Sequence, residues 1–222
     1  GKKMKNYARV VVIGGGVVGV STLYHLVKKG WTDCVLIERK ELTSGSTWHA
    51  AGLLPLFNMS YSVGQIHKYS VDLYGRLEEE TGQYAGLSSV SNIRLATTQD
   101  RMDEYKQYAG VAQTIGVQVD ILTPNEVVDI WPLAVKDNLI GAIRHPMDGY
   151  IQPADLTQAL ATGARNRGAE IYRNTSVVGI KQTKNGWVVE TDKGTIECEH
   201  VVSCSGNFAR QTGKMVGLDI PV

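Results

Sequence analysis

A glycine-rich turn between an apolar strand and a helix limits the possible fold of this chain more than any other feature. The run from Arg9 to Ile13 is short, β-branched and uninterrupted, which is typical of a parallel strand buried on both faces. Gly14 ends this run, and Val17 to Lys29 follows with apolar residues at helical spacing and a glycine as its stop. A second apolar run ends at Glu38. This βαβ unit predicts the α/β class, with a doubly wound, parallel, Rossmann-like sheet.

The glycines of the turn are spaced as GxGxxG at Gly14, Gly16 and Gly19. This spacing lets the backbone approach a diphosphate and points the N-terminus of the following helix at its charge. Glu38 lies roughly 20 residues further on, where a carboxylate can accept hydrogen bonds from ribose hydroxyls and would repel a 2′-phosphate. The pattern fits NAD and FAD equally well. The alternative is that the glycines serve only a tight turn and that Glu38 is a solvated strand end.

The middle of the chain has a different pattern. An amphipathic helix is expected from Val63 to Glu80, with Ile66, Tyr69, Leu73 and Leu77 on one side and Gly82 as its stop. Between residues 86 and 149 we expect an alternating strand, a helix, and a capping box in the run TPNE at residues 123–126. This mixture predicts an inserted α+β segment that belongs to a substrate domain.

After the insertion, the sequence again favours a sheet. A helix is expected from Pro153 to Arg167, and turns at Asn185-Gly186 and Lys193-Gly194 predict two hairpins before the buried strand HVVSCSG. We therefore expect residues 1–85 and 150–222 to form two parts of one cofactor-binding domain, with 86–149 as the inserted substrate-domain segment.

Composition excludes several classes of function. Lys and Arg number 23 against 22 Asp and Glu, so the net charge of +1 supplies no basic field for nucleic acid. No apolar run approaches the roughly 20 residues that span a bilayer. Cys34, Cys198 and Cys204 have scattered spacing that fits neither a disulfide framework nor a metal cluster. We expect no nucleic-acid partner, no membrane partner and no metal.

The segment from Glu41 to Pro55, ELTSGSTWHAAGLLP, carries the most specific resemblance. It resembles the flavin-attachment segment of the dimethylglycine and sarcosine dehydrogenase family, within the D-amino acid oxidase-like (DAO) flavoprotein superfamily. The resemblance implies FAD as the cofactor, bonded covalently through His49 to the 8α-methyl carbon of the flavin. The alternative is that His49 caps a helix or satisfies a buried polar group.

The resemblance also implies a set of cofactor contacts, and it covers nearly the whole chain. No catalytic acid or base can be assigned, and His25, His67, His145 and His200 are expected to be surface or packing residues. Phe208 stands where the family more often has tryptophan. The expected cofactor-binding residues are Gly14, Gly16, Val17, Val18, Gly19, Glu38, Arg39, Gly45, Ser46, Thr47, Trp48, His49, Ala50, Ala51, Gly52, Leu53, Val177, Gly206 and Phe208.

The resemblance implies oxidative N-demethylation of a small N-methylated amino acid, such as dimethylglycine or sarcosine. The electrons would pass to an electron-transfer flavoprotein or to oxygen. The one-carbon unit would leave as formaldehyde or pass to tetrahydrofolate in a further domain. The expected compartment is the mitochondrial matrix in a eukaryote and the cytoplasm in a bacterium. The resemblance also implies that the chain is a fragment, stopping inside a domain at Val222.

Two alternatives to this function stay open at the level of sequence. One is another flavin amine or amino-acid oxidase on the same scaffold. The other is a noncatalytic dinucleotide-binding module that uses its nucleotide for regulation or assembly. The two differ in the cofactor signal and the substrate turnover that each predicts.

Overall fold

The computed structural model describes residues 3–221, so the expected break at Val222 lies outside the described residues. The chain divides into two compact units. The sheet unit consists of Gly1–Ala51, Leu77–Gly86 and Gln152–Val222. The insertion unit consists of Gly52–Arg76 and Leu87–Ile151.

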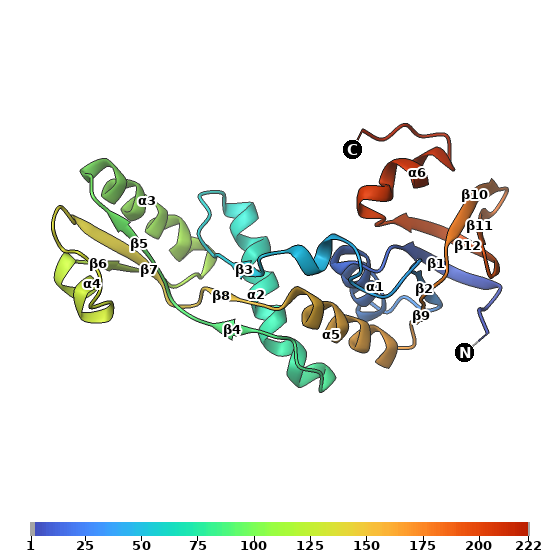
Figure 1. Ribbon diagram of the computed structural model, residues 1–222, viewed down its shortest axis with the longest axis horizontal. Coiled ribbons are helices and arrows are strands. Elements are labelled where there is room, and N and C mark those ends of the chain that lie inside the picture. The colour runs from blue at the N-terminus through green and yellow to red at the C-terminus, as the bar shows by residue number, and fades with distance from the viewer. Residues whose placement is uncertain (1–2, 222) are drawn as a thin grey trace. The chain divides into compact units, whose positions relative to one another are not determined.

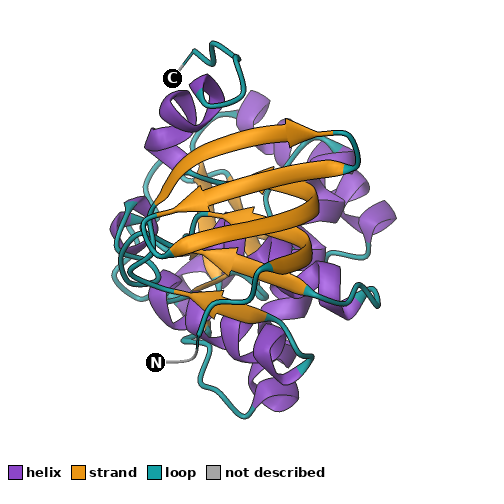
Figure 2. Cartoon of the chain, turned by 90° about the vertical axis from the view of Figure 1, so that its right-hand side faces the viewer, coloured by secondary structure: helices purple, strands orange, loops and turns teal. Residues whose placement is uncertain are grey.

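A six-stranded sheet forms the centre of the sheet unit (Figures 1 and 2). Four neighbouring strands are parallel, and a hairpin of two antiparallel strands extends them on one side. This arrangement confirms the predicted α/β class and its parallel sheet. In spatial order the strands are β10 (Val177–Thr183), β11 (Gly186–Thr191), β12 (Gly194–Ser203), β1 (Tyr7–Ile13), β2 (Cys34–Ile37) and β9 (Glu170–Tyr172).

Helices α1 (Val17–Lys28) and α5 (Pro153–Asn166) pack against each other in the sheet unit. Tyr24 of α1 is fully buried. A Cβ added at Gly163 of α5 would lie 2.8 Å from the Tyr24 ring, so the glycine permits this close packing. Short helical segments follow two of the strands along the chain. Segment η1 (Ser46–His49) comes after β2, and η2 (Gly206–Phe208) with α6 (Ala209–Lys214) comes after β12.

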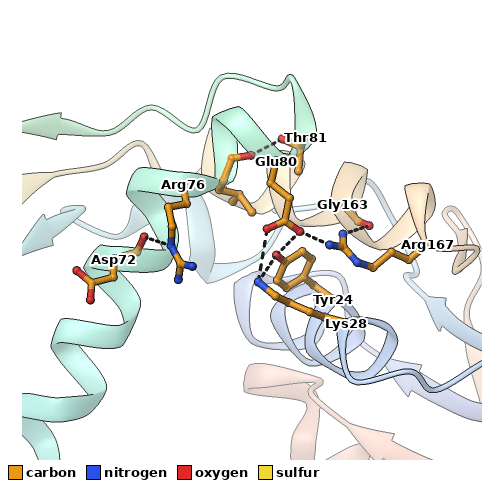
Figure 3. A network of polar contacts seen from close by, with 9 residues as sticks. Tyr24, Lys28, Asp72, Arg76, Glu80, Thr81, Gly163 and Arg167 are labelled. Atoms are coloured by element: carbon orange, nitrogen blue, oxygen red, sulfur yellow. Dashed lines mark hydrogen bonds and ion pairs between the residues drawn. The ribbon is translucent and has the colours of Figure 1, made fainter.

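The last turn of helix α2 (Tyr61–Thr81) is tied into the sheet unit by Glu80 (Figure 3). The Tyr24 hydroxyl donates a hydrogen bond of 2.7 Å to the Glu80 carboxylate. The Arg167 guanidinium donates to the same carboxylate oxygen, and the Lys28 ammonium lies 3.5 Å from the other oxygen. One carboxylate therefore joins α1, the end of α2 and the residue that follows α5.

The insertion unit contains two small antiparallel sheets with helices α3 (Gln99–Ile115) and α4 (Pro124–Ile130). One sheet has the order β3 (Leu53–Leu54), β8 (Gly149–Tyr150) and β4 (Ser88–Ser89). The other has the order β5 (Asn92–Ala96), β7 (Gly141–His145) and β6 (Asp120–Leu122). One hydrophobic core cluster of the insertion unit consists of Leu56, Ala96, Met102, Tyr105, Tyr108, Ala112, Val117 and Ile143.

The boundary of this unit differs from the expected segment 86–149. Residues Gly52–Arg76 belong to the insertion unit, although the sequence placed them in the first part of the cofactor-binding domain. The physical reason is non-local pairing: β3 pairs with β8, and Leu56 packs into the core cluster around Tyr108. The assignment of cofactor and substrate roles to the two units stays a prediction.

Several local predictions are confirmed. Thr123 and Glu126 form both hydrogen bonds of the capping box at the start of α4. Gly82 ends α2 with a φ of +67°, and the Asn185-Gly186 turn joins β10 to β11. The apolar stripe of α2 is buried at Leu73 and Leu77 only. Its other members are exposed, Ile66 by 63% and Tyr69 by 48%.

The helices within residues 3–221 include none with both the length and the apolar character needed to cross a bilayer.

Candidate functional site

The order of the parallel strands marks one end of the sheet as the place for a ligand. The chain passes from β1 to β2 on one side of β1, while β12 lies on its other side. Open α/β sheets bind ligands where the strand order reverses, beyond the carboxyl ends of the strands. In this chain that point lies between β1 and β12, next to the turn at Gly14.

A cavity of about 690 Å³ opens at this point, and all its lining residues belong to the sheet unit. Its walls come from the ends of β1, β2 and β12, the start of α1, the η1 turn and the start of β10. A cavity of this size is in the range that small-molecule and cofactor sites occupy.

The turn that begins the cavity needs glycine for steric reasons. Gly14 has a φ of +113°, and a Cβ there would lie 2.2 Å from the Cys204 carbonyl oxygen. A Cβ at Gly19 would lie 1.9 Å from the Gly14 carbonyl oxygen. Both glycines therefore allow α1, the end of β1 and the residue after β12 to approach one another closely. This packing accounts for the first and third glycines of the motif.

The Glu38 carboxylate is held by backbone groups at the end of β2. One of its oxygens accepts a hydrogen bond of 2.7 Å from the Gly15 N–H, and the other accepts one of 2.8 Å from the Lys40 N–H. Each carboxylate oxygen has a second lone pair, so the side chain can still accept hydrogen bonds from ribose hydroxyls. Glu38 is therefore more than a solvated strand end.

The N-terminus of α1 faces the cavity through Gly16 and Val17. Gly16 is the N-cap and provides no side-chain hydrogen bond, and the first turn contains no acidic residue. The Val17 N–H instead donates to the Thr47 hydroxyl oxygen at 3.0 Å. Because no acidic residue of the first turn compensates it, the partial positive charge of this helix N-terminus can favour an anion such as a diphosphate.

Arg39 and Phe208 meet in the cavity lining. The Arg39 guanidinium carbon lies 3.6 Å from the centre of the Phe208 ring, which is close enough for a cation–π contact. Phe208 is 41% exposed, so part of its surface stays accessible beside Arg39. The residue that departs from the family pattern is therefore still an aromatic part of the wall.

The η1 turn carries His49 at the margin of the cavity. Thr47 and Ala50 line the cavity, whereas Trp48 and His49 are not among its lining residues. The two rings pack together with centroids 3.6 Å apart and planes inclined by 33°. The His49 ring is exposed and, within residues 3–221, forms no hydrogen bond. Its ring neither caps a helix nor satisfies a buried polar group, which argues against the structural alternative for this residue.

Thirteen of the expected cofactor-binding residues line the cavity together, and six do not. Gly19 packs behind the turn, Trp48, His49 and Ala51 flank the lining residues, and Gly52 and Leu53 belong to the insertion unit. Cofactor binding by any of these residues stays a prediction. The lining members are Gly14, Gly16, Val17, Val18, Glu38, Arg39, Gly45, Ser46, Thr47, Ala50, Val177, Gly206 and Phe208.

The same walls contain other residues that are not among the expected cofactor-binding residues. Most follow the carboxyl end of a parallel strand, and the rule that ligands bind at these ends was the signal that could have identified them. Others come from α6, whose position after β12 no local pattern reveals. These further lining residues are Ile13, Gly15, Ile37, Ser44, Thr175, Ser176, Cys204, Ser205, Asn207, Gln211, Thr212 and Met215.

Three histidines outside the attachment segment, His25, His145 and His200, have local hydrogen-bond or ring contacts, and Cys204 is partly buried. The His25 ring hydrogen-bonds within α1, and His200 lies edge-on to Trp31. His145 is fully buried in the insertion unit beside Phe57 and Tyr108. Burial raises the pKa of the Cys204 thiol, which favours the protonated form over a reactive thiolate.

The residues that line the cavity fit the diphosphate and the ribose of an FAD molecule. The helix N-terminus suits the diphosphate, the anchored Glu38 carboxylate suits the ribose, and the small residues Gly45, Ala50 and Gly206 leave room along the wall. A Cβ added at Gly45 or Gly206 would meet nothing within 4 Å, so the wall is open at both positions.

Comparison with known proteins agrees with this geometry. The chain is 44% identical over 219 residues to "Dimethylglycine dehydrogenase, mitochondrial" of Rattus norvegicus, which covers 98% of this chain and 26% of that protein. It is 37% identical over 222 residues to "Sarcosine dehydrogenase, mitochondrial" of Mus musculus, which covers 97% of this chain and 24% of that protein. A third relative, 40% identical over 208 residues, is the "Pyruvate dehydrogenase phosphatase regulatory subunit, mitochondrial" of Mus musculus, with 93% of this chain and 24% of that protein covered.

Among solved structures, the L-proline dehydrogenase from P. horikoshii has a TM-score of 0.86 at 28% identity, covering 99% of this chain and 58% of that one. The chain thus spans about a quarter of the length of the curated relatives it matches. The DAO family model, "FAD dependent oxidoreductase", matches residues 9–222. The resemblance predicted from the Trp-His segment is confirmed, and this chain belongs to the family of FAD-dependent oxidoreductases.

Proposed function

We propose that the protein containing this chain oxidises the N-methyl group of a small N-methylated amino acid, such as dimethylglycine or sarcosine, with FAD attached covalently through His49. The single observation that carries the proposal is the position of the η1 turn. Its residues Ser46 and Thr47 line the cavity at the glycine turn, and His49 lies two positions after Thr47 with an exposed ring that forms no hydrogen bond within residues 3–221. The names of two relatives, which are 44% and 37% identical to this chain, support the substrate class.

When bound, FAD would supply the two-electron acceptor for oxidation of a carbon–nitrogen bond. The residues of this chain would bind and orient it. The start of α1 would compensate the diphosphate charge, Glu38 would accept hydrogen bonds from the ribose, and His49 would hold the far end of the cofactor. The group that receives the proton of the substrate amine is not assigned among these residues.

The proposed reaction needs an acceptor for the electrons and a product for the methyl carbon. The electrons leave to an electron-transfer flavoprotein or to oxygen, and the one-carbon unit leaves as formaldehyde or passes to tetrahydrofolate in a further domain. We propose the mitochondrial matrix as the compartment in a eukaryotic source, because two relatives carry the word mitochondrial in their names. The proposed compartment in a bacterial source is the cytoplasm.

The attachment is tested on the denatured full-length protein. Yellow fluorescence that migrates with the polypeptide on a denaturing gel is expected for the parent protein and for His200→Ala, a control at an exposed histidine that does not line the cavity. The His49→Ala variant should lose the fluorescent band while still binding FAD noncovalently. A fluorescent band in His49→Ala would contradict attachment at this residue.

The substrate class needs a separate measurement. Turnover by the full-length protein should be compared for dimethylglycine, sarcosine, a longer N-methylamino acid and an unmethylated amino acid. Preference for the first two supports the proposal, and preference for the unmethylated compound favours a different amino-acid oxidase.

A noncatalytic role has one specific observation in its favour, since a regulatory subunit is 40% identical to this chain. That alternative predicts a bound dinucleotide without turnover of any of these amines. A flavin absorbance spectrum that is bleached by sarcosine or dimethylglycine would exclude it.

A further inference from the structure

A hydroxyl from the η1 turn caps helix α1 across a long stretch of sequence. The Val17 N–H, at the first position of α1, donates to Thr47 Oγ1 at 3.0 Å. The N-cap residue itself is Gly16, which makes no side-chain hydrogen bond. An N-cap hydroxyl normally comes from the residue that precedes the helix. Here Thr47 supplies it from 30 residues further along the chain.

The glycine turn is shaped to receive this hydroxyl. A Cβ added at Gly16 would lie 3.0 Å from Thr47 Oγ1, so any larger residue would press on the threonine. A second hydrogen bond joins the same two segments: the Thr43 N–H donates to the Gly15 carbonyl oxygen at 3.0 Å. The segment from Thr43 to Thr47 is therefore held at both ends against the same turn.

His49 lacks any comparable anchor of its own. Its ring contacts the Trp48 ring and, in the part of the chain that the structure describes, accepts or donates no hydrogen bond. The η1 turn is closed by the Ala50 N–H, which donates to the Thr47 carbonyl oxygen at 3.2 Å. His49 lies inside this closed turn, so the position of its backbone follows from the position of Thr47.

We propose that the Thr47 hydroxyl is a positioning group for covalent attachment at His49. Its hydrogen bond joins the η1 turn to the N-terminus of α1, which is the proposed diphosphate site. The distance between the His49 imidazole and the phosphates of the same cofactor is thereby restricted. This inference rests on the proposed function. Attachment joins an imidazole nitrogen to the 8α-carbon. The nitrogen and the carbon each lose one proton, and the two electrons released pass through the flavin ring to dioxygen, which takes up two protons and becomes hydrogen peroxide.

The test compares Thr47→Val, which keeps the shape and removes the hydroxyl, with Thr47→Ser, which keeps the hydroxyl. The full-length apoprotein is mixed with FAD, and the fluorescence retained by the denatured polypeptide is followed with time. We expect Thr47→Val to attach FAD about threefold to tenfold more slowly, the effect of losing one neutral hydrogen bond. Thr47→Ser should stay close to the parent rate. Thr43→Val is the control, because the Thr43 contact uses its backbone N–H.

A second measurement separates positioning from cofactor affinity. In the His49→Ala background, which cannot attach FAD, Thr47→Val should change the noncovalent dissociation constant by less than it changes the attachment rate. Equal losses of affinity and rate would overturn the positioning role. An unchanged attachment rate in Thr47→Val, or a Thr47→Ser variant as slow as Thr47→Val, would overturn it as well.

Failure of the proposed function would look different. Parent protein that binds FAD and never attaches it contradicts attachment at His49, whatever the Thr47 variants do. The anchor is then decided without flavin, by hydrogen exchange of the Val17 amide in the FAD-free proteins. This amide should exchange faster in Thr47→Val than in the parent or Thr47→Ser. Equal exchange in all three proteins would overturn the anchor.

Discussion

The Glu38 carboxylate and the Gly15 N–H, both in the cavity lining, are joined by a hydrogen bond of 2.7 Å. This bond links the end of β2 to the middle of the glycine turn, and a second bond from the Lys40 N–H holds the other carboxylate oxygen. The acidic residue that the sequence assigns to the ribose is therefore also a structural support of the turn assigned to the diphosphate.

Replacing Glu38 by Ala should weaken FAD binding through both roles. The substitution removes the ribose acceptor and leaves the Gly15 and Lys40 N–H groups without their partner. Loss of hydrogen bonds to a charged group costs about 1.5–3 kcal/mol, so the dissociation constant should rise about 10-fold to 100-fold. The measurement is flavin fluorescence titration of the full-length protein in the His49→Ala background, where binding is reversible.

Glu41→Ala is the matched control for this prediction. Glu41 follows Glu38 by three positions, but its exposed carboxylate bonds to Arg173 and Asn174 and it does not line the cavity. Exposed ion pairs contribute little, so FAD affinity should stay within about twofold of the parent. Equal weakening by both substitutions would show that net charge, and not the Glu38 contact, controls affinity.

The first βαβ unit could be predicted from sequence because its signals are local. A β-branched run, the spaced glycines and a second apolar run lie within 38 residues, and each constrains the backbone by itself. The same holds for the capping box at Thr123 and for the Asn185-Gly186 turn. In all three cases the residues that define the structure are neighbours in sequence.

The features that sequence could not supply depend on contacts between distant residues. The pairing of β3 with β8 joins positions about 95 residues apart and moves Gly52–Arg76 into the insertion unit. The bond between Val17 and Thr47 depends on the path of a loop that has no periodicity. Helical spacing in α2 identified an apolar side, but spacing does not determine which part of that side is covered, and Ile66 is exposed.

Two helical glycines should respond to alanine in opposite ways. Gly19→Ala would place a Cβ 1.9 Å from the Gly14 carbonyl oxygen, which is backbone and cannot rotate away. We expect a loss of at least about 3 kcal/mol in the free energy of unfolding, together with loss of FAD binding. Gly110→Ala in α3 meets nothing within 4 Å and should stabilise the protein by about 0.5–1 kcal/mol. Urea unfolding of the full-length protein measures both, and a Gly19→Ala variant as stable as the parent would contradict the packing role of this glycine.

The Glu80 cluster predicts a large effect from one surface carboxylate (Figure 3). In Glu80→Ala the buried Tyr24 loses the acceptor of its 2.7 Å hydrogen bond, and Arg167 loses its partner. We expect the free energy of unfolding to fall by about 1–3 kcal/mol, because the Tyr24 hydroxyl keeps only the bond it accepts from Lys28 and its O–H donor loses its partner. Glu79→Ala, at the preceding exposed acid of α2, is the control and should change stability by less than about 0.5 kcal/mol. Equal effects of the two substitutions, measured by thermal unfolding, would contradict the prediction.

His145 should make the stability of the protein depend on pH. Its ring is fully buried, and neither ring nitrogen has a hydrogen-bond partner within residues 3–221. Burial, with a smaller effect from the positive charge of Arg94, lowers the pKa of His145 to about 4. An unfolded histidine has a pKa of about 6.5, so between these values the unfolded chain binds the proton and the native state does not. Native stability therefore falls as the pH falls from about 6.5 to about 4.

The variant His145→Phe removes this titration and keeps an aromatic ring beside Phe57 and Tyr108. For the parent, the shift to a pKa of about 4 corresponds to about 2 kcal/mol of stability lost between pH 7 and pH 5 through His145. The difference in unfolding free energy between these two pH values should shrink by about that amount in His145→Phe. Phe57→Leu, which disturbs the same cluster without removing an ionisable group, should lower stability equally at both pH values. Because other titrating groups cancel between parent and variant, an unchanged pH difference in His145→Phe would mean that folding does not lower the pKa of His145.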